Sequence, residues 1–274
     1  MGRLPGTAYG VTTLVVPPGA LDGPEHRVEG AAYRHLFRAR RLAVGERLRV
    51  VDGAGGARWA EVAAVDRRRG RLRILDPAPS NEPSYRLELL VATPKKDRAS
   101  WLVEKATEVG AAAVRWLRSE RSPRTLAAGT RERLLRVAAA AVEQCGRSRV
   151  PEVTGVHGWN ELPGLLEGLE DRWFLHTEAG EGAPGEHAQR SIAETVDQAT
   201  GRAPSPTATA GGWSRRGASG AILIGPEGGW TFEEARELQR LDCRPVWLGE
   251  RILRVETAAV VAAAAVLLIH PSRP

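Results

Sequence analysis

The stretch AILIGPEGGW (221–230) decides how the second half of the chain is interpreted. Its apolar residues at 221–224 indicate a buried strand, which Gly225 and Pro226 then end. The turn that follows carries a carboxylate, Glu227, among glycines. Such a turn can be a plain chain reversal. It can also be a place where a ligand approaches the backbone, because glycine has no side chain to keep the ligand away.

Strands and helices alternate on both sides of this stretch. Strands are expected at 86–92, 112–117, 172–176, 221–225 and 245–249, and helices at 97–110, 130–146, 231–241 and 256–269. This alternation is typical of an α/β fold in which helices cover a mostly parallel sheet. Residues 80–274 are therefore predicted to form one α/β domain. The segment 179–219 interrupts it, and its Gly, Ala, Ser, Thr and Pro content indicates a mobile loop.

The first part of the chain has a different rhythm. Residues 1–79 show short strands separated by glycine-rich turns, with YRHLFRARRL (33–42) as the one candidate helix. The three prolines of DPAPSNEPS (76–84) indicate a linker. Residues 1–73 hold 14 Arg against 7 Asp and Glu, whereas the whole chain has a net charge of +6. We therefore expect the N-terminal part to face a polyanion.

Composition excludes several classes of protein. The only cysteines, Cys145 and Cys243, can form neither a disulfide framework nor a metal site with ligand spacing, so we expect a reducing compartment and no metal. The N-terminus lacks the apolar core of a signal peptide. The longest apolar run, 257–269, is shorter than the roughly 20 residues that span a bilayer. The expectation is a cytoplasmic protein without membrane contact.

Three of the predicted strands end in polar or glycine-rich turns, namely FLHTEAG (174–180), ILIGPEGGW (222–230) and VWLGERILRVETA (246–258). In a parallel sheet these ends lie at one edge and can form a pocket. No GxxxxGK[ST] or GxGxxG motif is present, and the apolar side chains suit an adenine or a thioether better than a triphosphate. The residues predicted to line this pocket are Thr177, Glu178, Ile224, Gly225, Pro226, Glu227, Gly228, Gly229, Leu248, Gly249, Ile252, Leu253 and Arg254.

Five motifs occur in the order found in one bacterial enzyme family. They are HLFRARRLAVGE (35–46), PKKDRASWLVEKATEVGAAAV (94–114), AVEQCGRSRVPEV (141–153), IGPEGGWTFEE (224–234) and LGERILRVETA (248–258). Through them nearly the whole chain resembles the 16S ribosomal RNA uridine-N3 methyltransferases of the SPOUT superfamily. The resemblance implies S-adenosylmethionine as methyl donor, a PUA-like β-barrel at 1–79 that grips RNA, and a SPOUT domain at 80–274 tied in a trefoil knot. It also implies a homodimer that acts on 16S ribosomal RNA or the small ribosomal subunit.

The resemblance also suggests which side chains act on RNA. Uridine N3 lies on the Watson–Crick edge, so the base must be unpaired or flipped out, and the N3 proton must leave. Arg147, Glu143 and Arg254 are the candidates for the catalytic side. The alternatives are a surface cation for Arg147 and an ion pair with Arg147 for Glu143. The residues expected to contact RNA are His35, Arg38, Arg41, Lys95 and Lys96. Their alternative is a solvated basic face, and the arginines at 67–69 are interpreted as an exposed turn without a specific role.

Two other functions stay open at this point. One is an RNA-binding ribosome assembly factor that keeps the fold without catalysis. The other is a methyltransferase of the same fold that acts on another RNA nucleotide. The glycines at 225, 228, 229 and 249 argue against the first, because a lost cofactor site would tolerate side chains there.

Overall fold

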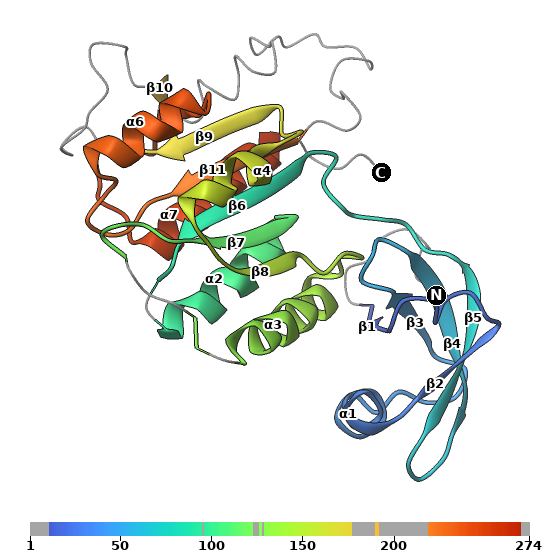
Figure 1. Cartoon of the computed structure of the whole chain (residues 1–274). Coiled ribbons are helices and arrows are strands. Elements are labelled where there is room, and N and C mark those ends of the chain that lie inside the picture. The colour runs from blue at the N-terminus through green and yellow to red at the C-terminus, as the bar shows by residue number, and fades with distance from the viewer. Residues whose placement is uncertain are drawn as a thin grey trace, which may run out of the picture. The chain divides into compact units, whose positions relative to one another are not determined.

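The computed structural model describes residues 11–94, 96–122, 126–127, 129–176, 190–191 and 219–269. The chain divides into two compact units, each with its own sheet (Figure 1). Among the described residues, the first unit contains 11–82 and 139–150. The second unit contains the rest, from Pro83 to Ala138 and from Pro151 onward.

The first unit is built on a curled sheet of five strands in the order β1-β3-β4-β5-β2. The strands are β1 (Thr13–Val15), β2 (Glu25–Val28), β3 (Arg47–Val51), β4 (Ala57–Val65) and β5 (Gly70–Pro77). β1 runs parallel to β3, and the other neighbours are antiparallel. β3, β4 and β5 lie in the part of the chain where short strands separated by glycine-rich turns are expected, and the start of β5 alternates between buried and exposed residues. Leu48, Val50, Val62 and Leu72 are fully buried on the inner face.

A short helical segment packs on this sheet. The helix α1 (Gly30–Tyr33) continues into the π-helix η1 (Arg34–Ala39), in the region of the predicted helix. Tyr33, Leu36 and Phe37 point into the core of the first unit, while Arg34 and Arg38 are exposed.

The second unit contains a sheet of seven parallel strands in the order β10-β12-β9-β11-β6-β7-β8. The predicted parallel sheet is therefore confirmed. The strands are β6 (Arg86–Ala92), β7 (Ala113–Leu117), β8 (Glu152–His157), β9 (Asp171–Leu175), β10 (Arg190–Ser191), β11 (Ser219–Ile224) and β12 (Arg244–Trp247).

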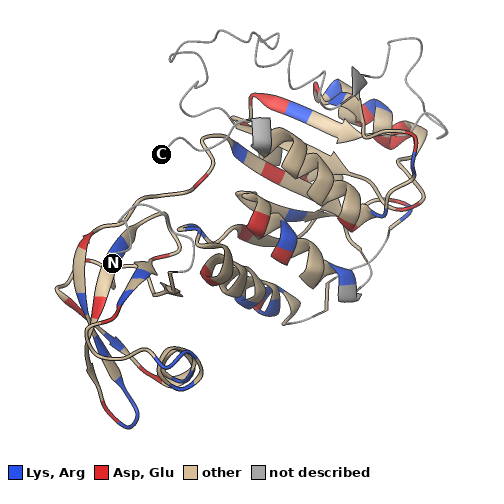
Figure 2. Cartoon of the chain, turned by 180° about the vertical axis from the view of Figure 1, so that it is seen from behind, with Lys and Arg blue, Asp and Glu red and all other residues tan. Residues whose placement is uncertain are grey.

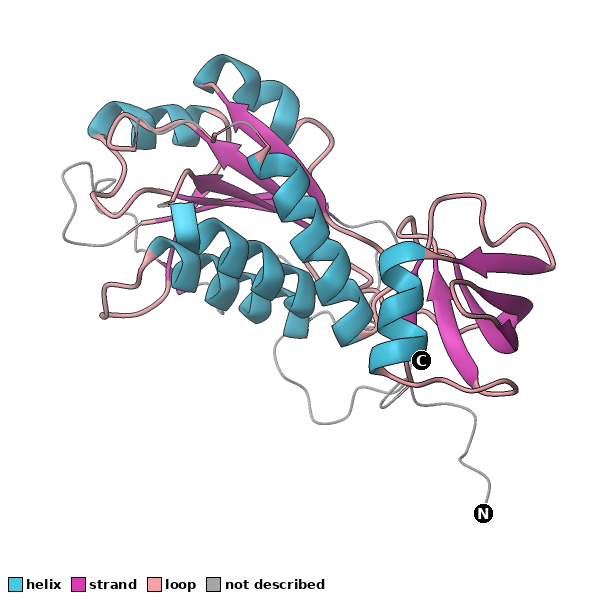
Figure 3. Ribbon diagram, turned by 90° about the horizontal axis from the view of Figure 1, so that it is seen from below, coloured by secondary structure: helices cyan, strands magenta, loops and turns pink. Residues whose placement is uncertain are grey.

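Helices lie on both sides of this sheet (Figure 3). They are α2 (Lys96–Val109), α3 (Thr130–Cys145), the 3-10 turn η2 (Trp159–Glu161), α4 (Leu162–Leu166), α6 (Phe232–Arg240) and α7 (Val255–Ile269). α4 and α6 share a core with Phe174 and Leu223, whereas α7 packs on α2, β6 and β11. The apolar run at 257–269 is thus part of a packed helix. No helix in the described part of the chain is long and apolar enough to cross a membrane.

Two features differ from the expected organisation. The predicted boundary at residue 80 is crossed, because residues 139–150 at the end of α3 group with the first unit. Hydrogen bonds explain this grouping, since Glu143 accepts from the Val15 backbone N–H and Val150 donates to Gly53. Within the predicted loop at 179–219, residues 190–191 form the edge strand β10, and Ser219 begins β11. The rest of that segment lies outside the described residues.

Candidate functional site

Three neighbouring strands bring their carboxyl ends together in the second unit. β12, β9 and β11 are adjacent in the sheet, so the ends of all three lie at one edge. The loops after β11 and β12 and the end of β9 line a cavity of about 280 Å³. This volume is close to the lower end of the range of small-molecule pockets, about 300–1,000 Å³. The sheet order therefore produces a pocket where parallel α/β sheets bind ligands.

The lining of this cavity includes most of the predicted pocket residues. They are Ile224, Gly225, Pro226, Glu227, Gly228, Gly229, Leu248, Gly249, Ile252 and Leu253. Arg254 is not among the lining residues, although both of its chain neighbours are, and Thr177 and Glu178 lie outside the described residues. Sequence reasoning missed six further residues, each close in the chain to a predicted loop. They are Leu175, His176, Trp247, Arg251, Val255 and Ala258.

The glycines of the two loops are required for different reasons. A Cβ atom at Gly225 would lie 2.9 to 3.1 Å from ring atoms of Trp230, which is 2% exposed. Trp230 cannot move aside easily, because its indole N–H donates to the Leu175 carbonyl at 3.0 Å. Gly229 and Gly249 instead have φ values of +70° and +107°, which residues with a Cβ rarely adopt. Packing and backbone conformation, rather than ligand approach alone, thus explain these glycines.

A second loop supports the GPEGG turn from outside. We call residues 118–122, which follow β7, the brace loop. The Arg121 guanidinium donates to the Gly228 carbonyl at 2.6 Å. The carboxylate of Glu234, which is 7% exposed, accepts from the Glu120 N–H at 2.8 Å and the Thr231 N–H at 2.9 Å. Because these bonds join the brace loop to the carboxyl end of the turn and to the start of α6, they hold this side of the pocket wall in place.

Charged groups connect the same turn to the final helix. Arg98 on α2 lies 3.1 Å from the Glu256 carboxylate and 3.9 Å from the Glu227 carboxylate. Glu256 belongs to the first turn of α7, where a carboxylate is favoured by the positive end of the helix dipole. Glu227 is half-exposed and lines the cavity, so it keeps access to a ligand.

His176 is a buried titratable group in the wall of this cavity. This residue follows directly after β9 in the chain and is 7% exposed. Burial lowers the pKa of its imidazole below the ordinary value. The ring is therefore neutral near pH 7 and can offer a ligand one N–H donor and one acceptor nitrogen.

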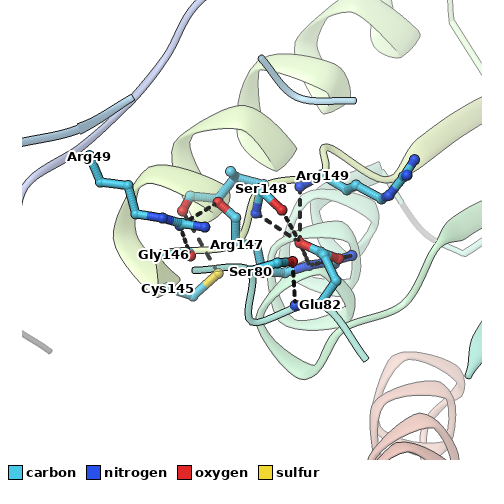
Figure 4. A network of polar contacts seen from close by, with 9 residues as sticks. Arg49, Ser80, Glu82, Cys145, Gly146, Arg147, Ser148 and Arg149 are labelled. Carbon is cyan, nitrogen blue, oxygen red and sulfur yellow. Dashed lines mark hydrogen bonds and ion pairs between the residues drawn. The ribbon is translucent and has the colours of Figure 1, made fainter. Parts of the chain in front are cut away.

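Arg147 lies in the first unit, in a polar network that Figure 4 shows from close by. It is 4% exposed, and its guanidinium donates to the Glu82 carboxylate, with Nη2 at 2.7 Å from Oε2. The other Glu82 oxygen accepts from the backbone N–H groups of Ser148 at 2.8 Å and Arg149 at 2.9 Å. The fully buried Arg49 donates to the carbonyls of Gly146 and Pro79. This network fixes the segment after α3 to the linker that follows β5.

Two opposing effects act on the ionisation of Glu82. Burial alone would raise the pKa of this carboxyl group. The hydrogen bonds and ion pair with Arg147, together with the N–H groups of Ser148 and Arg149, outweigh burial and hold the pKa below the ordinary value. Glu82 is therefore ionised in the folded protein, as the buried positive charge of Arg147 requires.

These contacts give Arg147 and Glu143 partners within the first unit, and the catalytic roles predicted for the two residues stay predictions. The Arg147 guanidinium is buried and already paired with Glu82, so it is not the surface cation of the alternative interpretation. The Glu143 carboxylate accepts from the Val15 N–H at 3.0 Å. Neither residue is among those that line the cavity. Their described contacts support a structural role, which local sequence spacing could not reveal because Glu82 and Val15 are distant in the chain.

The residues predicted to bind RNA are placed as follows. His35 and Arg38 lie on η1, Arg41 follows it with a φ of +57°, and all three are exposed. Figure 2 shows the basic residues on this helical segment and on the hairpin of β4 and β5. Lys96 is the first residue of α2, and Lys95 lies outside the described residues.

Comparison with known families gives two matches. Residues 80–267 match the RNA methyltransferase domain, and residues 28–75 match the RNA methyltransferase PUA domain. The first match alone covers more than half of the chain.

Curated relatives match over most of their length. The ribosomal RNA small subunit methyltransferase E of Mycobacterium tuberculosis is 30% identical over 245 residues, which cover 87% of this chain and 84% of the relative. The protein of the same name from Bacillus subtilis is 26% identical over 251 residues, or 89% of this chain and 90% of the relative.

Solved structures share the fold. The ribosomal RNA small subunit methyltransferase E of Neisseria gonorrhoeae, bound to S-adenosyl methionine, has a TM-score of 0.74 at 24% identity, covering 93% of this chain and 96% of that one. A probable rRNA-methyltransferase from Porphyromonas gingivalis has a TM-score of 0.69 at 25% identity, covering 86% and 90%.

Proposed function

The chain belongs to the RNA methyltransferase family, and from that premise we propose that it transfers a methyl group from S-adenosylmethionine to N3 of a uridine in 16S ribosomal RNA. The observation that carries the proposal is the cavity formed by the ends of β9, β11 and β12. The names of the curated relatives support ribosomal RNA of the small subunit as substrate. The resemblance described above supports the uridine N3 position.

The cavity suits the methyl donor in its chemistry. Leu175, Ile224, Leu248 and Leu253 give apolar surface for an adenine ring and a thioether. The glycine-rich backbone and the neutral His176 add hydrogen-bonding groups, and Glu227 offers a carboxylate for a positively charged group. When bound there, the donor would supply an electrophilic methyl group on its sulfonium sulfur, and the neutral thioether would leave as the bond from sulfur to the methyl carbon breaks.

The protein then has to align uridine N3 with the methyl carbon and to stabilise the charge left when the N3 proton departs. We assign the second task to Arg254. It stands between two cavity-lining residues, and its carbonyl accepts from the Ala258 N–H at 2.8 Å, which fixes its backbone at the start of α7. Its exposed guanidinium forms no ion pair among the described residues, so it stays available to the negative charge on the deprotonated uracil.

An Arg254→Ala variant is expected to lose about 100-fold in kcat, the cost of removing one donor to a developing oxyanion. The KM for S-adenosylmethionine should change by less than about threefold, because Arg254 does not line the cavity. Steady-state kinetics check this split. Arg251→Ala is the comparison. Because Arg251 lines the cavity, this substitution should raise KM more than it lowers kcat. Equal kcat values for wild type and Arg254→Ala would remove Arg254 from the mechanism.

An Arg121→Ala variant is expected to bind S-adenosylmethionine about tenfold more weakly, because one charge-assisted hydrogen bond to the GPEGG turn is lost. Arg121→Lys should restore part of the affinity. Calorimetric titration measures both constants. Arg118→Ala, an exposed change three residues earlier in the same loop, is the control. If both alanine variants bind equally well, the brace loop does not position the turn.

The proposed function is tested by the product. The purified protein is incubated with labelled S-adenosylmethionine and either 16S ribosomal RNA or small subunits that lack the modification. Digestion to nucleosides followed by mass spectrometry is expected to show 3-methyluridine. A methyl group on a ribose oxygen or on another base would overturn the N3 assignment. It would still show that the protein is an RNA methyltransferase. Absence of product with both substrates, despite cofactor binding, would support the assembly-factor alternative.

We extend the proposal to the architecture and the partners. The first unit, with His35, Arg38 and Arg41, contacts RNA together with Lys95 and Lys96, and the protein acts in the cytoplasm. α7 is part of a trefoil knot. Single-molecule pulling on both termini tests this, because a knot that tightens in the unfolded chain leaves its end-to-end length shorter than that of an unknotted chain. Two copies pair through the exposed apolar side chains of Val261 on α7 and Trp101 on α2, 42% and 43% exposed. Sedimentation equilibrium measures this pairing.

A further inference from the structure

The turn between β4 and β5 packs against the helical segment of the first unit. The Tyr33 hydroxyl on α1 donates to the Asp66 carbonyl at 2.6 Å, and the Arg38 guanidinium on η1 donates to the Arg67 carbonyl at 3.3 Å. The turn itself is closed by the Asp66 N–H, which donates to the Arg69 carbonyl at 2.8 Å. The arginines at 67–69, which have no role in the sequence interpretation, therefore stand beside the arginines of η1.

Close packing holds the two elements together. A Cβ atom at Gly70, the residue after the arginines, would collide with the ring of Phe37 on η1. Glycine at this position lets the turn approach the helix. Tyr33 and Phe37 are 6% and 8% exposed, and their rings lie 5.3 Å apart. The packed rings of Tyr33 and Phe37 thus fix the position of the turn relative to η1, and with it the positions of the arginines on both elements.

The π-helix directs its arginines outward. The Arg40 N–H donates to the His35 carbonyl at 3.0 Å, five residues back, so this turn contains one residue more than an α-helical turn. Leu36 is fully buried, whereas Arg34, Arg38 and Arg40 are exposed. Single π-turns of this kind occur frequently at functional sites.

We call the exposed arginines of the two elements the arginine ridge; its members are Arg34, Arg38, Arg40, Arg41, Arg67, Arg68 and Arg69. None of the seven forms an ion pair with any described carboxylate. Nearby arginines on the strands differ, since Arg27 lies 3.9 Å from Glu29, Arg71 lies 3.7 Å from Glu25 and Arg73 lies 2.8 Å from Glu61. The ridge is visible in Figure 2 as blue segments on the helix and at the tip of the hairpin.

Seven like charges that form no ion pair with a described carboxylate repel one another in the free protein. We propose that the arginine ridge binds the sugar–phosphate backbone of RNA, and that Arg67, Arg68 and Arg69 form an RNA-contacting element of their own. Guanidinium groups match phosphate through their planar fork and are weakly hydrated, so a row of arginines without lysine fits a phosphate backbone. The matched PUA region, residues 28–75, contains both elements of the ridge. The proposal depends on the proposed function only for RNA as the partner.

The test compares two triple variants that lose the same charge from the same unit. One is Arg67→Gln, Arg68→Gln and Arg69→Gln. The control is Arg27→Gln, Arg71→Gln and Arg73→Gln, which removes exposed arginines that already have carboxylate partners. RNA affinity is measured between about 50 and 300 mM potassium chloride, where the salt dependence of phosphate binding is steep, on a 16S ribosomal RNA fragment and on an unrelated structured RNA of equal length. A third variant with lysine at 67, 68 and 69 keeps the charge.

The ridge variant is expected to lower the slope of log K against log salt by about 2 to 3, roughly one for each phosphate that the protein no longer neutralises. Its affinity should fall at least about tenfold near physiological salt on both RNAs. The lysine variant should keep the wild-type slope, and all variants should bind S-adenosylmethionine as the wild type does. Equal slopes for the ridge variant and the control variant would overturn the proposal. If the wild-type protein bound both RNAs equally well, this would count against the proposed function. The difference in salt slope between the ridge variant and the control variant would still test whether the arginine ridge binds RNA.

Discussion

A Gly225→Val variant is expected to bind S-adenosylmethionine about 10- to 100-fold more weakly than the wild type, since overpacking a filled site costs about 1–3 kcal/mol and displaces its neighbours. The valine side chain would enter the space of the Trp230 ring, which lies 2.9 Å from the position of the added Cβ. Trp230 is anchored to the Leu175 carbonyl, so the GPEGG turn has to move instead. That turn lines the cavity with all five of its residues, 225–229, directly after the lining residue Ile224 of β11. Calorimetric titration measures the affinity.

Gly155→Val provides the matched control for this variant. Gly155 lies on β8 of the same unit, and an added Cβ atom would meet nothing within 4 Å. Gly228 is the milder comparison, because a Cβ there would meet the flexible Arg121 side chain at 3.3 Å. The loss of affinity on substitution with valine should therefore be largest at Gly225, smaller at Gly228 and smallest at Gly155. Wild-type affinity in a folded Gly225→Val protein would show that this turn does not form the cofactor site.

A Glu82→Ala variant is expected to lose about 3–5 kcal/mol of unfolding free energy, the usual cost of leaving one member of a buried ion pair without its partner. Arg147 would stay buried and lose its ion pair with Glu82, and the N–H groups of Ser148 and Arg149 would lose their acceptor. Urea unfolding of the full chain measures the loss. Glu25→Ala removes an exposed carboxylate 3.7 Å from Arg71 in the same unit and should cost less than about 1 kcal/mol. Similar losses in both variants would mean that the network of Figure 4 does not stabilise the first unit.

The same pair predicts how stability depends on pH. The folded-state pKa of Glu82 is depressed, so its contribution is present above the unfolded-state pKa and is lost as the pH falls through the folded-state value. As the pH falls below the ordinary carboxyl value of 4.5, the wild type should therefore lose this contribution progressively, and its stability should approach that of Glu82→Gln. Urea unfolding of both proteins at several pH values checks the trend. A constant difference over this range would show that Glu82 does not ionise with a lowered pKa.

Much of the second unit is predictable because its signals are local. The helices at 97–110 and 130–146 follow from their apolar spacing and from Gly110 and Gly146, which have φ values of +104° and +76° at the helix ends. β8 and the short β10 escape such reasoning. β8 alternates only weakly between buried and exposed residues, and β10 has two residues inside a segment of loop composition.

The candidate site divides in the same way. The loops at 224–229 and 248–253 stand out in the sequence because glycines follow apolar strands, which is a feature of neighbouring residues. The pairing of Arg147 with Glu82 is invisible in the sequence, because the two residues are 65 positions apart and no spacing rule connects them. The turn at 67–69 has no visible role in the sequence because Tyr33 and Arg38, which hold it, lie about one helix and two strands earlier.

Residue type and short-range spacing are enough to establish five of the seven strands of the parallel sheet, the glycine-rich turns at its strand ends and the basic character of the N-terminal part. In these properties period and turn chemistry act directly, over a few positions. The packing of whole elements is what makes β12, β9 and β11 neighbours, pairs Glu82 with Arg147 and joins two groups of arginines into one ridge. None of these pairings can be read from the order of residues, because burial and charge compensation depend on which surfaces meet rather than on which residues are adjacent in the chain.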